Sequence, residues 1–142
     1  MAKAAFRPAF GGTITYPYNP VTHLETRIEA ASKEAQPITL DQECKVISRV
    51  KLAQRMNVNL SGLRVQIGDT IITLLGIVAT AFPGDLIGAG SRLGFWPSEV
   101  PLYISAKLSS GEILDPGDVL DLSPLATIQP ATWIAEWRKR NQ

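Results

Sequence analysis

The sequence predicts an α+β fold with an extended N-terminal arm, one or two helices, a mostly antiparallel β-sheet or small barrel, and a short C-terminal helix. Two observations support this class. Apolar residues follow helical spacing before residue 58, whereas period-2 alternation and turn dipeptides dominate from residue 58 to residue 122. Helix and strand patterns are thus separated along the chain, which favours α+β over an alternating α/β architecture.

The chain has 142 residues, which suits one domain, and we expect an arm at 1–21 followed by a single globular domain at 22–142. A net charge of +1 argues against a strong nucleic-acid or membrane-surface binder, since such partners select a basic surplus. One cysteine excludes an internal disulfide, and one histidine excludes a His-rich metal site. We expect no cofactor.

The predicted arm is rich in proline, which disfavours helix at the preceding residue. Four aromatic residues lie within it: Phe6, Phe10, Tyr16 and Tyr18. Three interpretations stay open for this segment, namely an arm draped over its own domain, an arm packed on a neighbouring subunit, and simple disorder.

The first predicted helix covers residues 22–35. Thr22 and Glu25 form a T-x-x-E capping box, and Leu24 and Ile28 begin an apolar face that ends before Pro37. In this prediction Glu25 lies on the solvated face.

Residues 39–56 fit two structures. Leu40, Cys44 and Ile47 have helical spacing, whereas Val46, Val50 and their neighbours also suit one face of a strand. We favour the helix. The stretch from residue 45 to residue 64 contains five basic residues and no acidic residue, and it predicts a basic outer surface.

The β region begins with the alternation of residues 63–67, followed by a Gly68-Asp69 turn and an apolar, β-branched central strand at 71–78. Residues 84–98 are rich in glycine and predict a long loop. A further strand at 102–108, a turn at 109–111, a Pro116-Gly117 turn and a closing strand at 119–122 complete the prediction.

The C-terminal segment 130–140 predicts a short amphipathic helix. Trp133 and Trp137 share one face, and Arg138, Lys139 and Arg140 lie in the last turn, where cations interact favourably with the helix dipole. Tryptophan beside arginine also suits single-stranded nucleic acid, but three charges are few, so docking against protein is the favoured interpretation.

No catalytic constellation is found. His23 would be needed for a Ser-His-Asp or Cys-His site, but it stands without a partner motif, and Cys44 is expected to be a buried, inert thiol. The glycines of 88–94 do not have the spacing of a dinucleotide or Walker loop.

An acidic stretch surrounds the Pro116-Gly117 turn and does not match an EF-hand loop. Its members are Glu112, Asp115, Asp118 and Asp121. Weak divalent binding, solvated turns and pairing with the basic stretch of another copy stay open as interpretations.

Three function classes remain. The favoured class is a non-enzymatic structural or interaction subunit of a large assembly, such as a virion capsid cement, decoration or head–tail protein. Its expected partners are other protein subunits, either copies of itself or a shell protein. The residues expected to bind these partners are Phe6, Phe10, Tyr16, Tyr18, Trp133, Trp137, Arg138, Lys139 and Arg140.

The alternatives are a small β-barrel module that binds nucleic acid or another polymer, and an enzyme that uses Asp, Arg and Tyr. The sequence shows no secretory signal and no apolar run of the ~20 residues that a spanning helix needs. We therefore expect synthesis in the cytoplasm, with the virion as a candidate final location.

Overall fold

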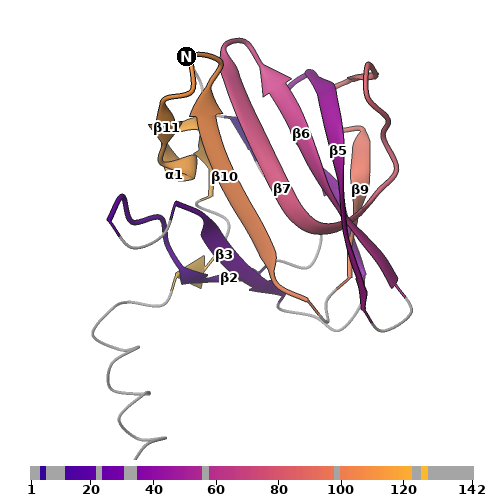
Figure 1. Ribbon diagram of the computed structural model, residues 1–142, viewed down its shortest axis with the longest axis horizontal. Coiled ribbons are helices and arrows are strands. Elements are labelled where there is room, and N and C mark those ends of the chain that lie inside the picture. The colour runs from indigo at the N-terminus through magenta and orange to yellow at the C-terminus, as the bar shows by residue number, and fades with distance from the viewer. Residues whose placement is uncertain are drawn as a thin grey trace, which may run out of the picture.

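The computed structural model describes residues 4–5, 12–21, 24–30, 35–55, 58–97, 100–122 and 126–127. These residues form β-strands and turns with a single short helix, α1 (Pro116–Val119) (Figure 1). The fold is therefore a β fold built on a large, mostly antiparallel sheet, and the predicted α+β class is wrong.

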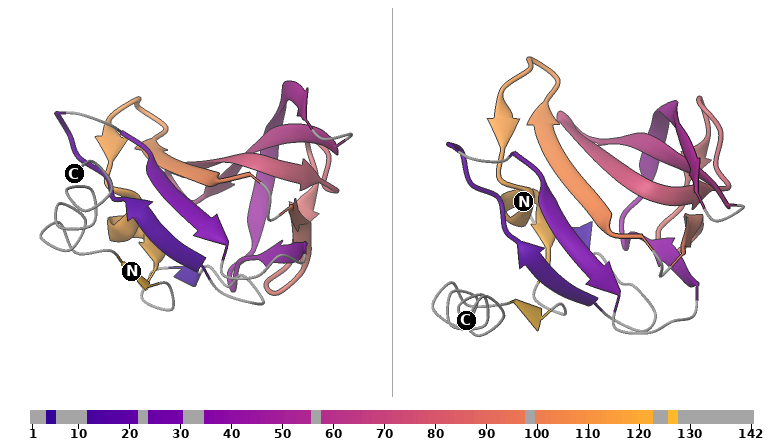
Figure 2. Two further views of the ribbon diagram at one scale, coloured as in Figure 1. Left: turned by 90° about the horizontal axis from the view of Figure 1, so that it is seen from below. Right: turned by 60° about the horizontal axis from the view of Figure 1, so that its bottom comes forward.

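The main sheet has a central path of eight strands, ordered β13-β2-β3-β10-β7-β6-β5-β8. Neighbours along this path are antiparallel except β13 and β2, which are parallel. Their bounds are β13 (Ala126–Thr127), β2 (Gly12–Tyr16), β3 (Thr26–Ala30), β10 (Leu102–Leu108), β7 (Thr70–Ala79), β6 (Val58–Ile67), β5 (Cys44–Arg55) and β8 (Leu86–Ile87). Figure 2 shows β7 between the β2–β3 pair and the β5–β6 hairpin.

Shorter strands complete the fold. β4 (Gln36–Thr39) pairs with β9 (Arg92–Trp96), and β9 also pairs with β7 at Val78 and Ala79. β11 (Ile113–Leu114) pairs with β10, and β1 (Ala4–Ala5) pairs in parallel with β12 (Leu120–Asp121). Because β7 pairs with both β6 and β9, it joins the main sheet to the smaller β4–β9 sheet.

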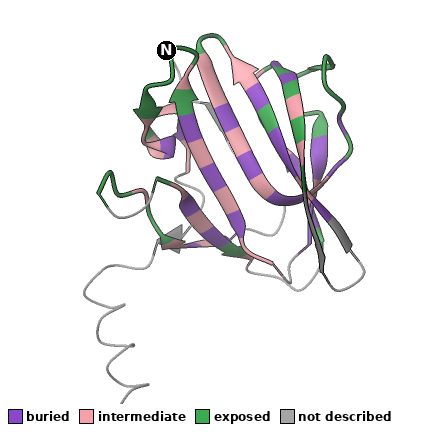
Figure 3. Cartoon of the chain, in the orientation of Figure 1, coloured by how far each residue is buried: buried purple, intermediate pink, exposed green. Residues whose placement is uncertain are grey.

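The core lies between these layers. Buried and half-buried residues alternate along β7 and β10, as expected for strands with one face on the core (Figure 3). Leu63, Leu74 and Ile104 are opposite one another on three adjacent strands and are fully buried. Ile38 and Trp96 of the β4–β9 sheet are equally buried in the same core.

The predicted helix over 22–35 is wrong, because its described residues include β3. Thr26 and Ile28 are buried, and Ile28 is opposite Ile14 on β2 and Leu102 on β10. Because β3 pairs with a strand on each edge, its backbone N–H and C=O groups are hydrogen-bonded within the sheet. A short helix here would need tertiary packing to supply most of its stability.

The favoured helix over 39–56 is also wrong, since β4 ends at Thr39 and β5 occupies Cys44–Arg55. β5 pairs with β6 along its length, with register shifts between Val46 and Ser48 and between Lys51 and Gln54. Such bulges change which side chains face the core.

Predicted strands at 63–67, 71–78 and 102–108 are confirmed as parts of β6, β7 and β10. The predicted loop over 84–98 instead contains β8 and β9. The Pro116-Gly117 turn is the one-turn helix α1, capped by Asp115, whose carboxylate accepts a 2.9 Å hydrogen bond from the Gly117 amide.

The described part of the predicted arm is integrated into the sheet. In β2, Ile14 is buried, and a Cβ on Gly12 would be 3.3 Å from the Trp96 ring. The domain division at residue 21 stays a prediction. The C-terminal helix predicted over 130–140 lies outside the described residues.

Candidate ligand pocket on the sheet face

An open pocket of about 340 Å³ lies on the sheet face opposite the core. Its position follows from strand alternation, because Leu75 and Tyr103 come next to the core residues Leu74 and Ile104 and therefore point to the other side. The lining residues are Glu25, Leu60, Leu75, Gly76, Val100, Pro101 and Tyr103.

The floor of the pocket comes from three neighbouring strands. Leu75 on β7 is opposite both Gly62 on β6 and Tyr103 on β10, and Leu60 lies two residues from Gly62. A Cβ on Gly62 would approach Leu75 Cδ2 to 2.5 Å, so the missing side chain leaves room for the leucine to lie over β6. The result is an apolar surface closed at one side by the tyrosine ring.

One wall of the pocket is held by a buried indole. Trp96 is fully buried, and its Nε1 donates a 2.8 Å hydrogen bond to the Val100 carbonyl. Gly76 has φ +99°, and a Cβ there would be 2.5 Å from the Pro101 carbonyl oxygen. Val100 and Pro101 can approach β7 this closely because residue 76 is glycine.

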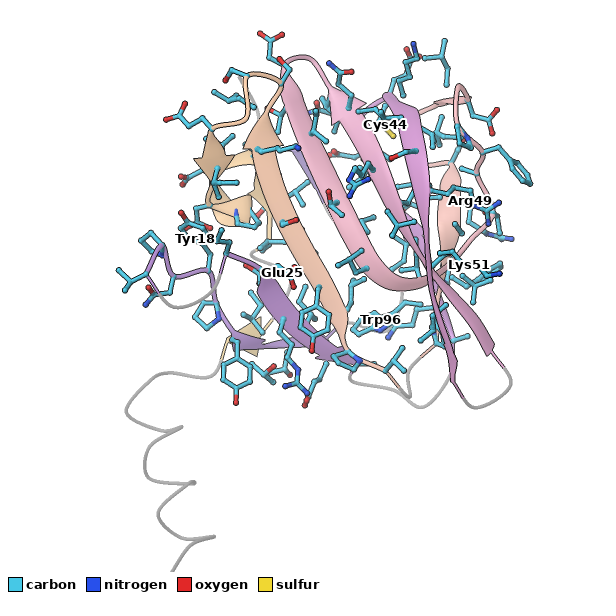
Figure 4. All side chains as sticks on the ribbon, in the orientation of Figure 1. Tyr18, Glu25, Cys44, Arg49, Lys51 and Trp96 are labelled. Atoms are coloured by element: carbon cyan, nitrogen blue, oxygen red, sulfur yellow. The ribbon has the colours of Figure 1, made fainter. Side chains whose placement is uncertain are left out.

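Two polar groups face this apolar surface. Glu25, which directly precedes β3, supplies a carboxylate (Figure 4), and Tyr103 on β10 supplies a phenolic hydroxyl. Neither makes a hydrogen bond or ion pair with any residue that the structure describes. A carboxylate beside apolar walls attracts a cation more strongly than one in open water, because the local dielectric constant is lower.

Arg27 is a cation beside the pocket residue Tyr103, and it has partners of its own, although its buried Nε has no hydrogen-bond partner among the described residues. Arg27 is opposite Tyr103 across β3 and β10, its Nη2 lies 3.1 Å from Glu29 Oε1, and its guanidinium stacks 5.5 Å from the centroid of the Tyr16 ring. Glu25 therefore has no cationic partner among the described residues, and a carboxylate beside an apolar floor favours a group that combines a positive charge with an aliphatic or peptide portion.

The sequence predicted other residues as binding residues. Tyr16 is exposed and stacks on Arg27, and Tyr18 is half-buried; neither lines this pocket. The other seven lie outside the described residues, namely Phe6, Phe10, Trp133, Trp137, Arg138, Lys139 and Arg140. His23 also lies outside them.

Cys44 is buried, as predicted, and burial together with the Glu43 charge raises the pKa of its thiol to about 11. The glycine-rich segment 88–94 makes a structural backbone contact, since the Gly90 amide donates a 2.7 Å hydrogen bond to the Leu40 carbonyl.

Within the described ranges no three His, Cys, Asp or Glu residues gather closely enough to hold a metal ion. In the same part of the chain, no helix has the length and apolar character to cross a membrane.

The sequence prediction missed both polar residues of the pocket. The sequence pattern predicts Glu25 on the solvated face of a helix. It predicts a strand around Tyr103 but gives no reason to assign this residue to a binding site. The alternation of residues 102–108 does place Tyr103 on the face opposite the core, and this was the one available signal.

Comparisons with known proteins give a likeness of fold. No family model and no curated protein matches the chain. Among solved structures, lysostaphin in solution matches with a TM-score of 0.54 at 15% identity over 88% of this chain, and Csd3 of Helicobacter pylori matches with 0.51 at 14% identity over 95%. The chain spans 56% of the lysostaphin chain and 38% of the Csd3 chain, less than two thirds of either.

This likeness overturns the expectation that the chain is not an enzyme. That expectation depended on the absence of a catalytic constellation in the sequence, whereas the β fold found here is similar to those of lysostaphin and Csd3. At these identities the comparison establishes the fold alone.

Proposed function

We propose that this chain is a β module that binds a peptide segment of a polymer, taking a free amine or another cationic group of that segment into the Glu25 pocket. One observation carries the proposal: the Glu25 carboxylate and the Tyr103 hydroxyl face an apolar floor and have no partner among the described residues. Apolar pockets with a few polar groups that fix orientation are typical of ligand sites.

The likeness of fold supports a particular polymer. Lysostaphin and Csd3 are peptidoglycan-related proteins. Peptidoglycan carries short peptides whose amino groups are partly free, so it offers the combination of cation and peptide backbone that the pocket favours. We therefore propose peptidoglycan peptide as the ligand class.

Sedimentation with purified, insoluble peptidoglycan tests this function. We expect the chain to sediment with the polymer and Glu25→Gln to weaken retention by about tenfold or more, since a hydrogen bond to a charged group contributes about 1.5–3 kcal/mol. Asp69→Asn, at an exposed carboxylate outside the pocket, is the matched control. Acetylation of the polymer's free amines should have the same effect as Glu25→Gln.

Equal retention of wild type, Glu25→Gln and Asp69→Asn, or equal binding to acetylated polymer, would contradict the proposal. The supernatants from the same experiment show whether peptide bonds are cut. Release of soluble peptide that Glu25→Gln abolishes would replace binding with peptidase activity as the function of this pocket.

The structural-subunit role stays a prediction, as do its shell-protein partners and its location in a virion. A specific observation keeps the assembly role as a second candidate. Exposed basic residues on β5 and exposed acidic residues around β11 lie toward opposite ends of the strand order.

A further inference from the structure

Three large apolar side chains are exposed together around the start of β5. Ile47 is 39% exposed, Phe82 is 58% exposed and Leu86 is 69% exposed. Leu86 on β8 is opposite Lys45 on β5, and the Phe82 ring lies 4.8 Å from the Arg49 guanidinium carbon. Exposed apolar residues that cluster in this way are typical of a protein–protein interface.

Basic side chains surround this apolar group. Lys45, Arg49 and Lys51 are exposed, and none forms an ion pair with a residue that the structure describes. Two acidic residues, Glu43 and Asp85, are also exposed close by, and the Asp85 carboxylate accepts a hydrogen bond from the Phe82 amide. We define the basic edge by its apolar and cationic members, namely Lys45, Ile47, Arg49, Lys51, Phe82 and Leu86.

A surface of the opposite charge lies around β11 and α1. Glu112 and Asp118 are exposed without a described ion-pair partner, and Ile113 between them in sequence is 44% exposed. Asp115 is occupied as the cap of α1, and Lys107 is the exposed cation of this region, on β10 opposite Ile113. We define the acidic end as Glu112, Ile113 and Asp118.

The two surfaces lie toward opposite ends of the strand order. β11 lies beside β10, and β7 and β6 separate β10 from β5 (Figure 1). Adjacent strands are about 4.8 Å apart, so one molecule cannot bring its own basic edge onto its own acidic end. Each surface is complementary in charge to the other and carries exposed apolar area.

We propose that copies of this chain associate head to tail, with the basic edge of one copy on the acidic end of the next. The contact joins two different patches, so association continues into a ring or an open filament instead of stopping at a two-fold dimer. Exposed charges are screened by salt, so association weakens as ionic strength rises. This inference does not depend on a ligand in the Glu25 pocket.

Light scattering and sedimentation velocity of the purified chain test the proposal. At low ionic strength we expect species larger than a dimer, with mean mass falling as protein is diluted or as salt is raised to 0.5 M. The double variants Lys45→Glu/Lys51→Glu and Glu112→Lys/Asp118→Lys should each shift the midpoint of association to at least tenfold higher protein concentration. A circular dichroism spectrum like that of wild type shows that each variant is folded.

A charge-matched control and a mixing experiment separate the specific contact from net charge. Arg92→Glu changes an exposed charge on β9 that belongs to neither surface, and it should shift the midpoint far less than Lys51→Glu. An equimolar mixture of the two double variants should associate again, because each reversed surface then meets a partner of opposite sign. A monomer at low salt, or a mixture that stays monomeric, would overturn the proposal.

Discussion

The Nε1 atom of Trp96 donates a 2.8 Å hydrogen bond to the Val100 carbonyl, and it thereby ties the fully buried core to the wall of the Glu25 pocket. Trp96 belongs to β9, which pairs with both β4 and β7. The pocket wall is thus fixed by the packing of the smaller sheet, and changes in that packing should alter ligand binding.

Trp96→Phe should destabilise the fold by about 2–4 kcal/mol, since it leaves the Val100 carbonyl without its donor and removes part of a buried ring. Urea unfolding measures this change in free energy. Retention on peptidoglycan should fall as well, at temperatures where the variant is still folded. Unchanged retention by a folded variant would show that the Val100 wall is unimportant for binding.

Gly76→Ala should cost about 2–4 kcal/mol, because φ is +99° and the new Cβ would meet the Pro101 carbonyl oxygen at 2.5 Å. Gly84→Ala is the matched control, since φ there is +91° and nothing lies within 4 Å of the added Cβ. It should cost only about 1 kcal/mol. Equal losses for both variants in thermal or urea unfolding would remove the argument for a close approach at Gly76.

Much of the sheet could be predicted from the sequence, because period 2 is unambiguous where a strand has no bulge. Buried Leu63 and Val65 alternate with exposed Arg64 and half-buried Gln66, and this pattern correctly predicts a strand. Leu24 and Ile28 are four apart, a spacing that puts residues on one face of a helix and also on one face of a strand. The capping pattern at Thr22 then favoured the wrong alternative.

The error at 39–56 has a different physical cause. In β5 the buried or half-buried residues still alternate with exposed ones, but the side chains do not match this alternation, because the exposed Ile47 is apolar and the half-buried Ser48 is polar. The three-residue spacing of Cys44, Ile47 and Val50 then resembles a helix. In the structure Cys44 is buried and Ile47 is exposed, so these residues do not share an apolar face.

The pocket could not be predicted from the sequence, because it exists only after the strands are paired. Glu25, Leu60, Leu75 and Tyr103 belong to four distant segments that strand order brings together. None forms a local motif. The charge separation between residues 45–64 and 112–121 was visible in the sequence, but its placement on opposite sides of the sheet required the topology.

Cys44 predicts a pH dependence of stability. Burial raises the pKa of its thiol from 9.0 to about 11, so the unfolded chain loses this proton at lower pH than the folded chain. The stability that the neutral thiol contributes is therefore full below pH 9 and decreases as pH rises toward 11. The difference in unfolding free energy between wild type and Cys44→Ala should shrink over this range in urea titrations, and a constant difference would contradict the assignment.

Tyr103→Phe should separate binding from stability. The hydroxyl has no hydrogen-bond partner among the described residues, so its removal should change the free energy of unfolding by less than about 0.5 kcal/mol. Retention on peptidoglycan should still fall about threefold to tenfold, because a net hydrogen bond contributes about 0.5–1.5 kcal/mol. A large loss of stability in urea would mean that the hydroxyl serves the fold instead of a ligand.

The central claim is that the pocket on the sheet face is the ligand site, and amide chemical-shift mapping with soluble, amine-bearing peptidoglycan peptides tests it most directly. We expect the shifts to gather at Glu25, Leu75, Gly76 and Tyr103, and we expect Glu25→Gln to abolish them while Asp69→Asn does not. Shifts that gather at the basic edge, or a spectrum that stays unchanged at millimolar peptide, would contradict it.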